Sequence, residues 1–312
     1  MAISKVPEGE RRRRVAFLGP AGTFSEEALL GSASPEAVDP VPAASIPRAV
    51  AALREGEVEL AIVPIENSLE GSINVTLDLL AELSPELRIV GEALLRVRHC
   101  LIAAREEPIE RIEVVVSHPQ VPGQCSRFLR GELPRAEIRA ASSTAEAVRG
   151  VVAARDDATA ALGTALAAEI YGGVVLREGV EDRDDNETRF VWLARAADAE
   201  EAAPPLRAAG GEPRCSIVFW GPGAGHPGWL VRCLNEFAER EINLTKIESR
   251  PRREQLGEYM FFAELQGGEH DERVAAALDG LRGLCERVLV LGSYRAAAPA
   301  RPTVPAAPER ES

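Results

Sequence analysis

The sequence predicts an α/β protein with a two-lobed region followed by a smaller domain. Two observations support this prediction. Apolar runs alternate with amphipathic segments up to about residue 196, which is typical of mainly parallel sheets covered by helices. After a stretch rich in Ala, Glu, Pro and Gly, the chain follows the order strand, helix, strand, strand, helix, strand. That order is typical of a ferredoxin-like fold.

Composition and charge exclude several classes of protein. With 312 residues the chain is long enough for two domains, and 46% hydrophobic content with only 4% aromatic residues predicts a core of Ala, Val, Leu and Ile. A net charge of −13 argues against a nucleic acid or an anionic membrane as partner. No apolar run reaches the roughly 18 residues that span a bilayer, and the N-terminus lacks the apolar core of a signal peptide. We therefore expect a cytoplasmic protein.

The residues available for chemistry are limited. The five cysteines are scattered and form no C-x-x-C pair, and the four histidines are dispersed, so we expect free thiols and no metal site. Lys5 and Lys246 are the only lysines, and there is no G-x-x-x-x-G-K-[ST] phosphate loop. Chemistry must therefore use hydroxyls, carboxylates, arginines and backbone dipoles.

The first elements meet at a tight turn. An apolar run at 15–18 predicts a strand, and a Gly-Pro-Ala-Gly turn at 19–22 follows it. Thr23, with Glu26 three residues later, predicts a capping box that opens a helix. Free backbone N–H groups at such a helix start favour an anion, which makes Thr23 a candidate binding residue. A further helix is expected at 45–53.

A buried strand then ends in polar side chains. The continuous apolar run at 60–65 predicts a strand covered on both faces. Glu66, Asn67 and Ser68 follow it directly, where an open α/β sheet presents ligands. Asn74 is expected to cap the next helix.

The alternation continues into a second lobe. It predicts strands at 112–116, 136–140 and 159–162, and helices at 121–130, after Ser143 and at 164–171. The extended apolar stretch at 87–104 is expected to cross between the lobes, and the segment after Tyr171 to cross back. Two lobes joined by two crossings form a hinged cleft.

The main candidate site follows the return crossing. A polar run from Glu181 to Glu187 ends in Thr188, Arg189 and Phe190, and an apolar strand begins there. Arginine offers a planar fork for a carboxylate, and threonine offers a hydroxyl donor that can rotate. The alternative is an ordinary solvated loop before a strand, with Arg189 in an ion pair.

The C-terminal segments complete the domain organisation. The βαββαβ order is expected at 216–220, 229–240, 243–250, 258–265, 271–281 and 286–294. A G-x-G-x-x-G pattern at 223–228 is interpreted as a glycine-rich turn, because a dinucleotide fold needs more sheet than this domain provides. The expected boundaries are an extension at 1–14, the two-lobed region at 15–196 (lobes at about 15–95 with 180–196, and 96–179), a linker at 197–213, the small domain at 214–296 and a disordered tail at 297–312.

Five motifs together resemble the prephenate dehydratase family with a C-terminal ACT domain. They are Gly-Pro-Ala-Gly-Thr-Phe-Ser at 19–25, Pro-Ile-Glu-Asn-Ser at 64–68, Ser-His-Pro-Gln at 117–120, Ser-Ser-Thr-Ala at 142–145 and Asn-Glu-Thr-Arg-Phe at 186–190. The resemblance implies a catalytic region like a periplasmic binding protein, with its site between two lobes. It also implies conversion of prephenate to phenylpyruvate, carbon dioxide and water without metal or organic cofactor.

The resemblance assigns roles to particular residues. Thr188 would donate a hydrogen bond to the departing hydroxyl, Arg189 would clamp the pyruvyl carboxylate, and Phe190 would form an apolar wall. Glu66, a water or the substrate itself would supply the proton. The substrate-binding residues implied are Thr23, Glu66, Asn67, Ser68, Ser142, Ser143, Thr144 and Asn186.

The resemblance also implies an effector site. The stretch from Asn243 to Pro251 looks like the family's phenylalanine-binding motif, and the implied homo-oligomer, a dimer or tetramer, would pair its ACT domains and bind L-phenylalanine between them. The effector residues implied are Gly228, Trp229, Leu230, Asn243, Leu244, Glu248, Ser249, Arg250 and Pro251. The family has Gly-Ala-Leu at 228–230, so the indole of Trp229 is expected to fill or reshape this pocket.

Two other functions fit the same pattern. An arogenate dehydratase would act on a substrate with an amino group in place of the keto group. A non-catalytic amino-acid sensor would use the lobes and the ACT domain for binding alone, but it would not need the Thr-Arg-Phe combination.

Overall fold

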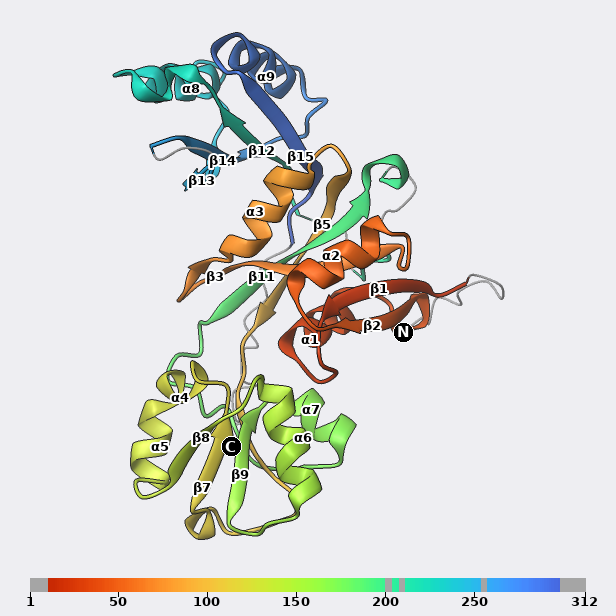
Figure 1. Ribbon diagram of the computed structural model, residues 1–312, viewed down its shortest axis with the longest axis vertical. Coiled ribbons are helices and arrows are strands. Elements are labelled where there is room, and N and C mark those ends of the chain that lie inside the picture. Colours follow the sequence, from red (N-terminus) through yellow and green to blue (C-terminus); the bar gives the residue numbers. More distant parts are fainter. Residues whose placement is uncertain (1–10, 200–203, 208–210, 254–256, 298–312) are drawn as a thin grey trace, which may run out of the picture.

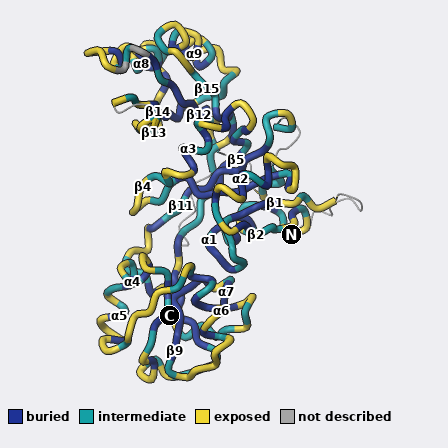
Figure 2. The backbone as a smooth tube through the Cα atoms, viewed as in Figure 1, coloured by how far each residue is buried: buried dark blue, intermediate teal, exposed yellow. Residues whose placement is uncertain are grey.

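The computed structural model describes residues 11–199, 204–207, 211–253 and 257–297. These form three units, which follow one another along the long axis in Figure 1: a second lobe, a first lobe and a C-terminal domain. Buried segments run through the centre of each unit (Figure 2). The predicted fold class, a two-lobed α/β region with a βαββαβ domain, is confirmed.

The first lobe is a mixed sheet with helices on both faces. Its strands run in the order β2-β1-β3-β11-β5, with β4 beside β3. They are β1 (Arg13–Leu18), β2 (Val38–Ala43), β3 (Leu60–Asn67), β4 (Gly71–Ser72), β5 (Leu87–Arg96) and β11 (Glu187–Arg195), and the helices are α1 (Phe24–Ser32), α2 (Ile46–Arg54) and α3 (Asn74–Leu83). Strands β1, β2 and β3 are parallel, whereas β11 is antiparallel to both β3 and β5.

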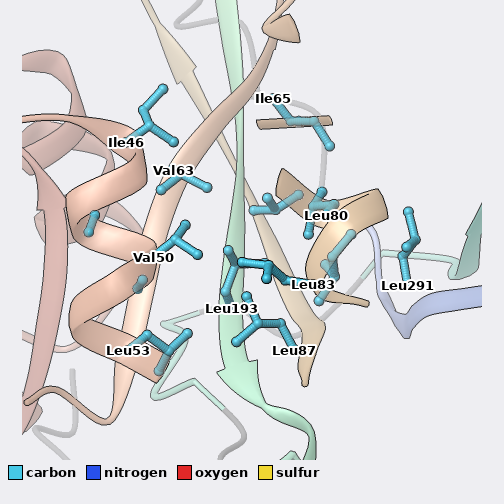
Figure 3. Close-up of a cluster of buried hydrophobic side chains, with 14 of the residues drawn as sticks. Ile46, Val50, Leu53, Val63, Ile65, Leu80, Leu83, Leu87, Leu193 and Leu291 are labelled. Carbon is cyan, nitrogen blue, oxygen red and sulfur yellow. The ribbon is translucent and has the colours of Figure 1, made fainter. Parts of the chain in front are cut away.

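Side-chain alternation along β11 divides the core of this lobe in two. Phe190 and Trp192 pack with Phe17 under α1. Val191 and Leu193 belong to the cluster on the other face, with residues of α2 and α3, and Figure 3 shows Leu193 there. Successive residues of a strand face opposite sides of its sheet, so each neighbour in this motif enters a different environment.

The second lobe repeats the architecture. Its sheet has the order β10-β6-β9-β7-β8. The strands are β6 (Cys100–Ala103), β7 (Val114–Ser117), β8 (Glu137–Ala140), β9 (Thr159–Gly163) and β10 (Val174–Glu178), and the helices are α4 (Val121–Gln124), α5 (Ser126–Glu132), α6 (Thr144–Ala154) and α7 (Ala165–Tyr171). Helices α4 and α5 cover one face, and α6 and α7 the other.

The expectation of mainly parallel sheets is wrong for the strands next to the lobe crossings. Strand β6 is antiparallel to β9 and β10, just as β11 is antiparallel to its neighbours. The crossings lie at 97–99 and 179–186, and they pair with each other: the Val97 N–H donates to the Asn186 carbonyl at 2.8 Å, and the Val180 N–H to the His99 carbonyl at 3.0 Å. A chain that leaves one sheet and returns beside its own exit must run antiparallel there.

The C-terminal domain has one four-stranded antiparallel sheet. Its order is β13-β14-β12-β15. The elements are β12 (Pro213–Trp220), α8 (Trp229–Ala238), β13 (Leu244–Pro251), β14 (Tyr259–Gln266), α9 (Glu272–Leu284) and β15 (Arg287–Arg295). Both helices pack on one face of the sheet, and the face that remains packs on the first lobe.

The C-terminal domain and the first lobe share a core. Leu291 and Phe262 join the cluster formed by α2, α3 and β11, and Figure 3 shows Leu291 near Leu83 of α3. A Cβ atom at Gly292 would collide with the backbone of Ile89 in β5, so only glycine permits this approach of β15 to β5. The two units are therefore packed as one body.

Short 3-10 helices lie at η1 (Pro35–Ala37), η2 (Ile109–Arg111), η3 (Ala196–Asp198) and η4 (Pro222–Gly225). Parts of the expected linker, at 200–203 and 208–210, and the expected tail from 298 onward lie outside the described residues, as do residues 1–10.

All five cysteines are free thiols. Within the described ranges, no helix is long and apolar enough to cross a membrane.

Candidate active site

A cleft of about 370 Å³ lies between the two lobes. Its lining comes from loops at the ends of strands and from the starts of helices. The lining residues are Leu18, Gly19, Thr23, Phe24, Ala44, Asn67, Glu70, Ile73, Val97, His99, His118, Gln120, Val121, Gln124, Ser142, Ser143, Thr144, Asn186 and Thr188. Seven of the residues predicted for the site meet there: Thr23, Asn67, Ser142, Ser143, Thr144, Asn186 and Thr188.

Asn67 fixes the orientation of the Thr188 hydroxyl. Its Oδ1 accepts hydrogen bonds from the backbone N–H groups of Leu69 (2.9 Å) and Glu70 (3.0 Å), so the amide can face only one way. Its Nδ2 therefore donates to Thr188 Oγ1 at 2.9 Å. Because this oxygen already accepts, the hydroxyl proton is free to point at a ligand in the cleft.

A second layer of hydrogen bonds holds this pair. Asn67 Nδ2 also donates to Asn186 Oδ1 at 2.9 Å, and the Ser68 hydroxyl donates to the same oxygen at 3.3 Å. Asn186 is buried. Ser68 does not line the cleft; it supports a residue that does.

Neutral donors and helix starts dominate the cleft. Ser143 is the N-cap of α6, and its hydroxyl accepts from the Glu146 N–H at 3.0 Å. The start of α1, at Thr23 and Phe24, faces the same space, although the Thr23 hydroxyl donates to the Leu18 carbonyl (2.8 Å) and does not cap the helix. No arginine or lysine is among the described residues of the lining. A bound anion would therefore depend on backbone N–H groups, hydroxyls and amides.

Arg189, which was expected to clamp a carboxylate of the substrate, does not line the cleft in this structure. Alternation turns its side chain away from Thr188, toward the C-terminal domain. Its guanidinium binds both carboxylate oxygens of Glu264, at 2.8 and 2.7 Å, and one oxygen of Glu66 at 2.8 Å. Arg189 is only 9% exposed, so the alternative of an ion pair holds, but in a buried site and not in a solvated loop.

Phe190 and Glu66 are also not part of the cleft lining. Phe190 is 1% exposed and packs under α1, so it forms no wall of the cleft. The Glu66 side chain lies on the same face as Arg189, opposite the cleft, and its carboxylate also accepts a hydrogen bond from Lys246 at 3.0 Å. The suggestion that Glu66 supplies a proton to the cleft is therefore wrong for this geometry.

Among the lining residues that were not predicted for the site, four polar ones form a hydrogen-bonded chain. Glu70 accepts hydrogen bonds from Gln120 (2.9 Å) and Gln124 (3.1 Å), which bridges the two lobes. Gln124 Oε1 lies 3.1 Å from Nε2 of His99, and because its amide nitrogen faces Glu70, His99 carries its proton on Nε2. Gln120 belongs to a quoted motif, but nothing local in the sequence identifies Glu70, Gln124 or His99.

The imidazole of His99 is neutral and has one free acceptor. Burial lowers its pKa, more than the contacts with Gln124 and Glu181 raise it. Its Nδ1 is buried without a hydrogen-bond partner. A hydrogen-bond donor on a ligand, or a water molecule, would satisfy this nitrogen.

Glu27 of α1 gives this lobe a pH-dependent stability. Burial raises the pKa of its carboxyl from 4.5 to about 7. Below pH 4.5, the ordinary pKa of this carboxyl, both the folded and the unfolded chain hold the proton. Between about pH 4.5 and pH 7 the unfolded chain releases the proton while the folded chain retains it. Stability should therefore fall as pH rises through this window and stay constant above it.

We expect Glu27→Gln to remove that dependence. At pH 8 the variant should be more stable than the parent by on the order of 1–3 kcal/mol, and at pH 4.5 the two should match. Urea unfolding at several pH values measures this. Equal curves at all pH values would contradict the assignment of the shift to burial.

The predicted effector residues divide into three groups. Trp229 lies in the core of the C-terminal domain, where its Nε1 donates to the Leu284 carbonyl at 2.9 Å; a Cβ atom at Gly223 would collide with the indole, which explains the glycine-rich turn. Leu230 and Leu244 pack partly against this core. Glu248 and Arg250 contact the first lobe. The exposed ones are Gly228, Asn243, Ser249 and Pro251.

Trp229 thus does not project from the surface into an effector pocket. It packs 6.3 Å from Phe219 and 5.9 Å from Phe261, between ring centroids. Arg250 makes two hydrogen bonds to Asp78 of α3, at 2.7 and 2.9 Å, so its fork is occupied within the chain.

Two α/β lobes around a polar cleft, joined to a βαββαβ domain, define a two-lobed ligand-binding region with a regulatory domain. The sequence model described as prephenate dehydratase matches residues 15–198, and the ACT domain matches 224–283. The chain belongs to the prephenate dehydratase family.

Three similar proteins show the extent of this relationship. The prephenate dehydratase of Mycobacterium sp. (strain JLS) is 41% identical over 291 residues, 90% of this chain and 88% of the relative. The structure of prephenate dehydratase from Arthrobacter aurescens in complex with L-Phe has a TM-score of 0.78 at 35% identity and 90% coverage of each chain. GqqA, described as a novel type of quorum quenching acylase, also has a TM-score of 0.78, at 29% identity, with 91% of this chain and 98% of GqqA covered.

Proposed function

We propose that this chain converts prephenate to phenylpyruvate, carbon dioxide and water, as the lyase activity of its family implies. The observation that supports this most directly is the Thr188 hydroxyl, which Asn67 orients so that its proton faces the cleft. The same cleft offers neutral anion-binding groups from both lobes.

The chemistry needs little beyond these groups. The bond from the ring to its carboxylate breaks, carbon dioxide leaves, and the electron pair enters the ring as the C–O bond to the hydroxyl breaks on the far side. Formation of the aromatic ring drives this step. A hydrogen bond from Thr188 to the departing oxygen stabilises the charge that develops there. Threonine is too weak an acid to give up its proton, so the departing hydroxide becomes water by uptake of one proton from the solvent, which balances the negative charge lost when the carboxylate leaves as carbon dioxide.

The two substrate carboxylates require separate anchors. The start of α6, with Ser142, Ser143 and Thr144, offers N–H groups and hydroxyls from the second lobe. The start of α1 offers N–H groups from the first lobe. An anion held at both helix starts would keep the lobes closed and exclude water from the leaving carboxylate.

We further propose that the C-terminal domain forms a homo-oligomer interface that binds L-phenylalanine. Strand β13 is an edge strand, and Ile247 on it is 47% exposed, while Val231 on α8 is 59% exposed. Asn243, directly before β13, and Gly228, directly before α8, are also exposed. An edge strand with apolar neighbours favours pairing with a second copy.

The test is a direct assay of the purified chain. Phenylpyruvate should form from prephenate, and added L-phenylalanine should lower the rate while D-phenylalanine should not. Size-exclusion chromatography with light scattering should give at least a dimer. A monomer with unchanged inhibition would contradict the interface, and absence of turnover with ligand-dependent thermal stabilisation would indicate a sensor.

Arogenate is the second candidate substrate. Glu70 places a carboxylate in the cleft, and a carboxylate favours an ammonium over a keto group. The same assay with arogenate, scored as phenylalanine, compares kcat/KM for the two substrates. A higher value for arogenate would replace prephenate in the proposal.

A further inference from the structure

A buried ionic cluster joins the C-terminal domain to the strand that carries Thr188. Its centre is the pair between Arg189 of β11 and Glu264 of β14, with two hydrogen bonds of 2.8 and 2.7 Å. Glu92 of β5 lies 3.5 Å from the same guanidinium. Arg214 of β12 binds Glu92 at 3.0 Å and Glu264 at 3.4 Å. Arg189, Glu92 and Glu264 are 9%, 5% and 5% exposed.

The cluster is balanced in charge and depends on every member. Burial opposes the charge of Arg189, but Glu264 and Glu92 outweigh it and raise the pKa of the guanidinium. Burial also raises the pKa of Glu92, against the attraction of Arg189 and Arg214. The two parallel hydrogen bonds to Glu264 and the third to Glu66 together fix the position of the Arg189 guanidinium.

The strand register connects this cluster to the cleft. Thr188 pairs with Asn67, and Arg189 pairs with Glu66, on the same two strands. On the cleft face Asn67 binds Thr188, and on the opposite face Glu66 binds Arg189 at 2.8 Å. A backbone shift at Arg189 therefore also moves the hydroxyl of Thr188. A β-bulge between Arg189 and Phe190 lies at this point, where the ladder is interrupted.

The C-terminal domain contributes two adjacent contacts to these strands. Glu264 of β14 lies opposite Lys246 of β13 in the sheet. Each of the two side chains forms an ion pair with one residue of the first lobe. Glu264 holds Arg189, and Lys246 holds Glu66 at 3.0 Å. Strand β13 is the one that carries the exposed edge and the expected effector motif.

We propose that Glu264 is a positioning residue for the reaction: through Arg189 it fixes the place of the Thr188 hydroxyl, so that the regulatory domain holds the catalytic strand directly. This inference rests on the proposed role of Thr188. Glu264 touches no substrate, and its effect reaches the cleft only through β11. A change at β13 or β14 would alter the rate of the chemical step more than the binding of substrate.

The test compares two buried ion pairs between the same two units. Glu264→Gln weakens the pair to β11. Asp78→Asn weakens the pair between Arg250 and α3, which joins the same two units but is more exposed at its carboxylate (19% against 7% for Glu264) and has no hydrogen bond to β3 or β11. Both variants are assayed for kcat and KM with prephenate, with thermal unfolding as a measure of folding.

We expect Glu264→Gln to lower kcat by about tenfold or more with KM changed by less than about threefold, because misplacement of a catalytic group by an ångström is costly. Asp78→Asn should keep kcat within about twofold. An unchanged kcat in Glu264→Gln, or an equal loss in both variants, would overturn the proposal.

Two further variants complete the design. If Glu264→Gln does not fold, Glu264→Asp decides: it keeps the charge but withdraws the carboxylate by one methylene, and kcat should fall by about threefold or more. A wild-type kcat in Glu264→Asp would then overturn the proposal. Thr188→Ala in the same assay distinguishes failure of the proposed site from failure of this inference. Full activity of Thr188→Ala would exclude the proposed site. An inactive Thr188→Ala beside a fully active Glu264→Gln would exclude only the role of Glu264.

Discussion

Thr188→Ala is expected to lower kcat for prephenate by about 10²–10⁴, with little change in KM. The hydroxyl lies in the cleft, accepts from Asn67 and so has its proton available for the departing oxygen. Alanine removes that donor and leaves the backbone of β11 in place. Steady-state rates of phenylpyruvate formation measure the effect.

The matched control is Thr188→Ser, which keeps the hydroxyl and loses only a methyl group. It should retain kcat within about tenfold, since serine has the same hydrogen-bonding capacity but more freedom to rotate. Circular dichroism and thermal unfolding should show both variants folded. A loss under about threefold in folded Thr188→Ala would exclude the hydroxyl from the reaction.

Arg189→Met is expected to destabilise the protein by about 3–5 kcal/mol, because it leaves two buried carboxylates to share Arg214. Glu264 and Glu92 are each 5% exposed, and Glu264 loses both of its hydrogen bonds to the guanidinium. Methionine fits the space but cannot neutralise the charge. Urea unfolding, followed by tryptophan fluorescence and circular dichroism, measures the free energy of unfolding.

Arg183→Met is the control for this measurement. Arg183 pairs with Asp185 at 2.7 Å in the same stretch of chain, but both side chains are 61% exposed. An exposed pair contributes about 0–1 kcal/mol, so this variant should unfold almost as the parent does. The double variant Arg189→Met with Glu264→Met should recover part of the loss, which would show direct coupling of the two side chains.

The opposite pattern would restore the role that the sequence suggested. If Arg189→Met were as stable as the parent and raised KM for prephenate strongly, the guanidinium would bind substrate. That outcome would require the cluster with Glu264 to open when the cleft is occupied.

The candidate site shows how far a sequence motif can be trusted. Thr188, Arg189 and Phe190 are adjacent, and adjacency suggested one shared site. Alternation turns Arg189 away from Thr188 and into the junction with the C-terminal domain, whereas Phe190 shares a face with Thr188 but lies one step further along the strand, in the core under α1. The period of two was available from the sequence, but which face met the cleft was not.

Local patterns determined most of the fold. The apolar runs, the cap at Ser143 and the βαββαβ order depend on residues close in the chain, so composition and spacing were enough to predict them. The polar end of the buried strand at 60–65 likewise placed Asn67 in the site, whereas Asn186 came from the resemblance to the family. These features follow from backbone hydrogen bonding and burial within one element or between neighbours.

Contacts between residues far apart in the chain depended on how the units pack. Arg189 meets Glu264 across 75 positions and Glu66 across 123, and His99 meets Gln124 across 25. The packing of whole sheets determines which opposite charges meet. A buried arginine binds the carboxylate that this packing brings close to it. Residue patterns therefore predicted the lobes, the cleft and the hydroxyl in it, whereas the packing of the C-terminal domain on β11 sets the partners of the neighbouring arginine.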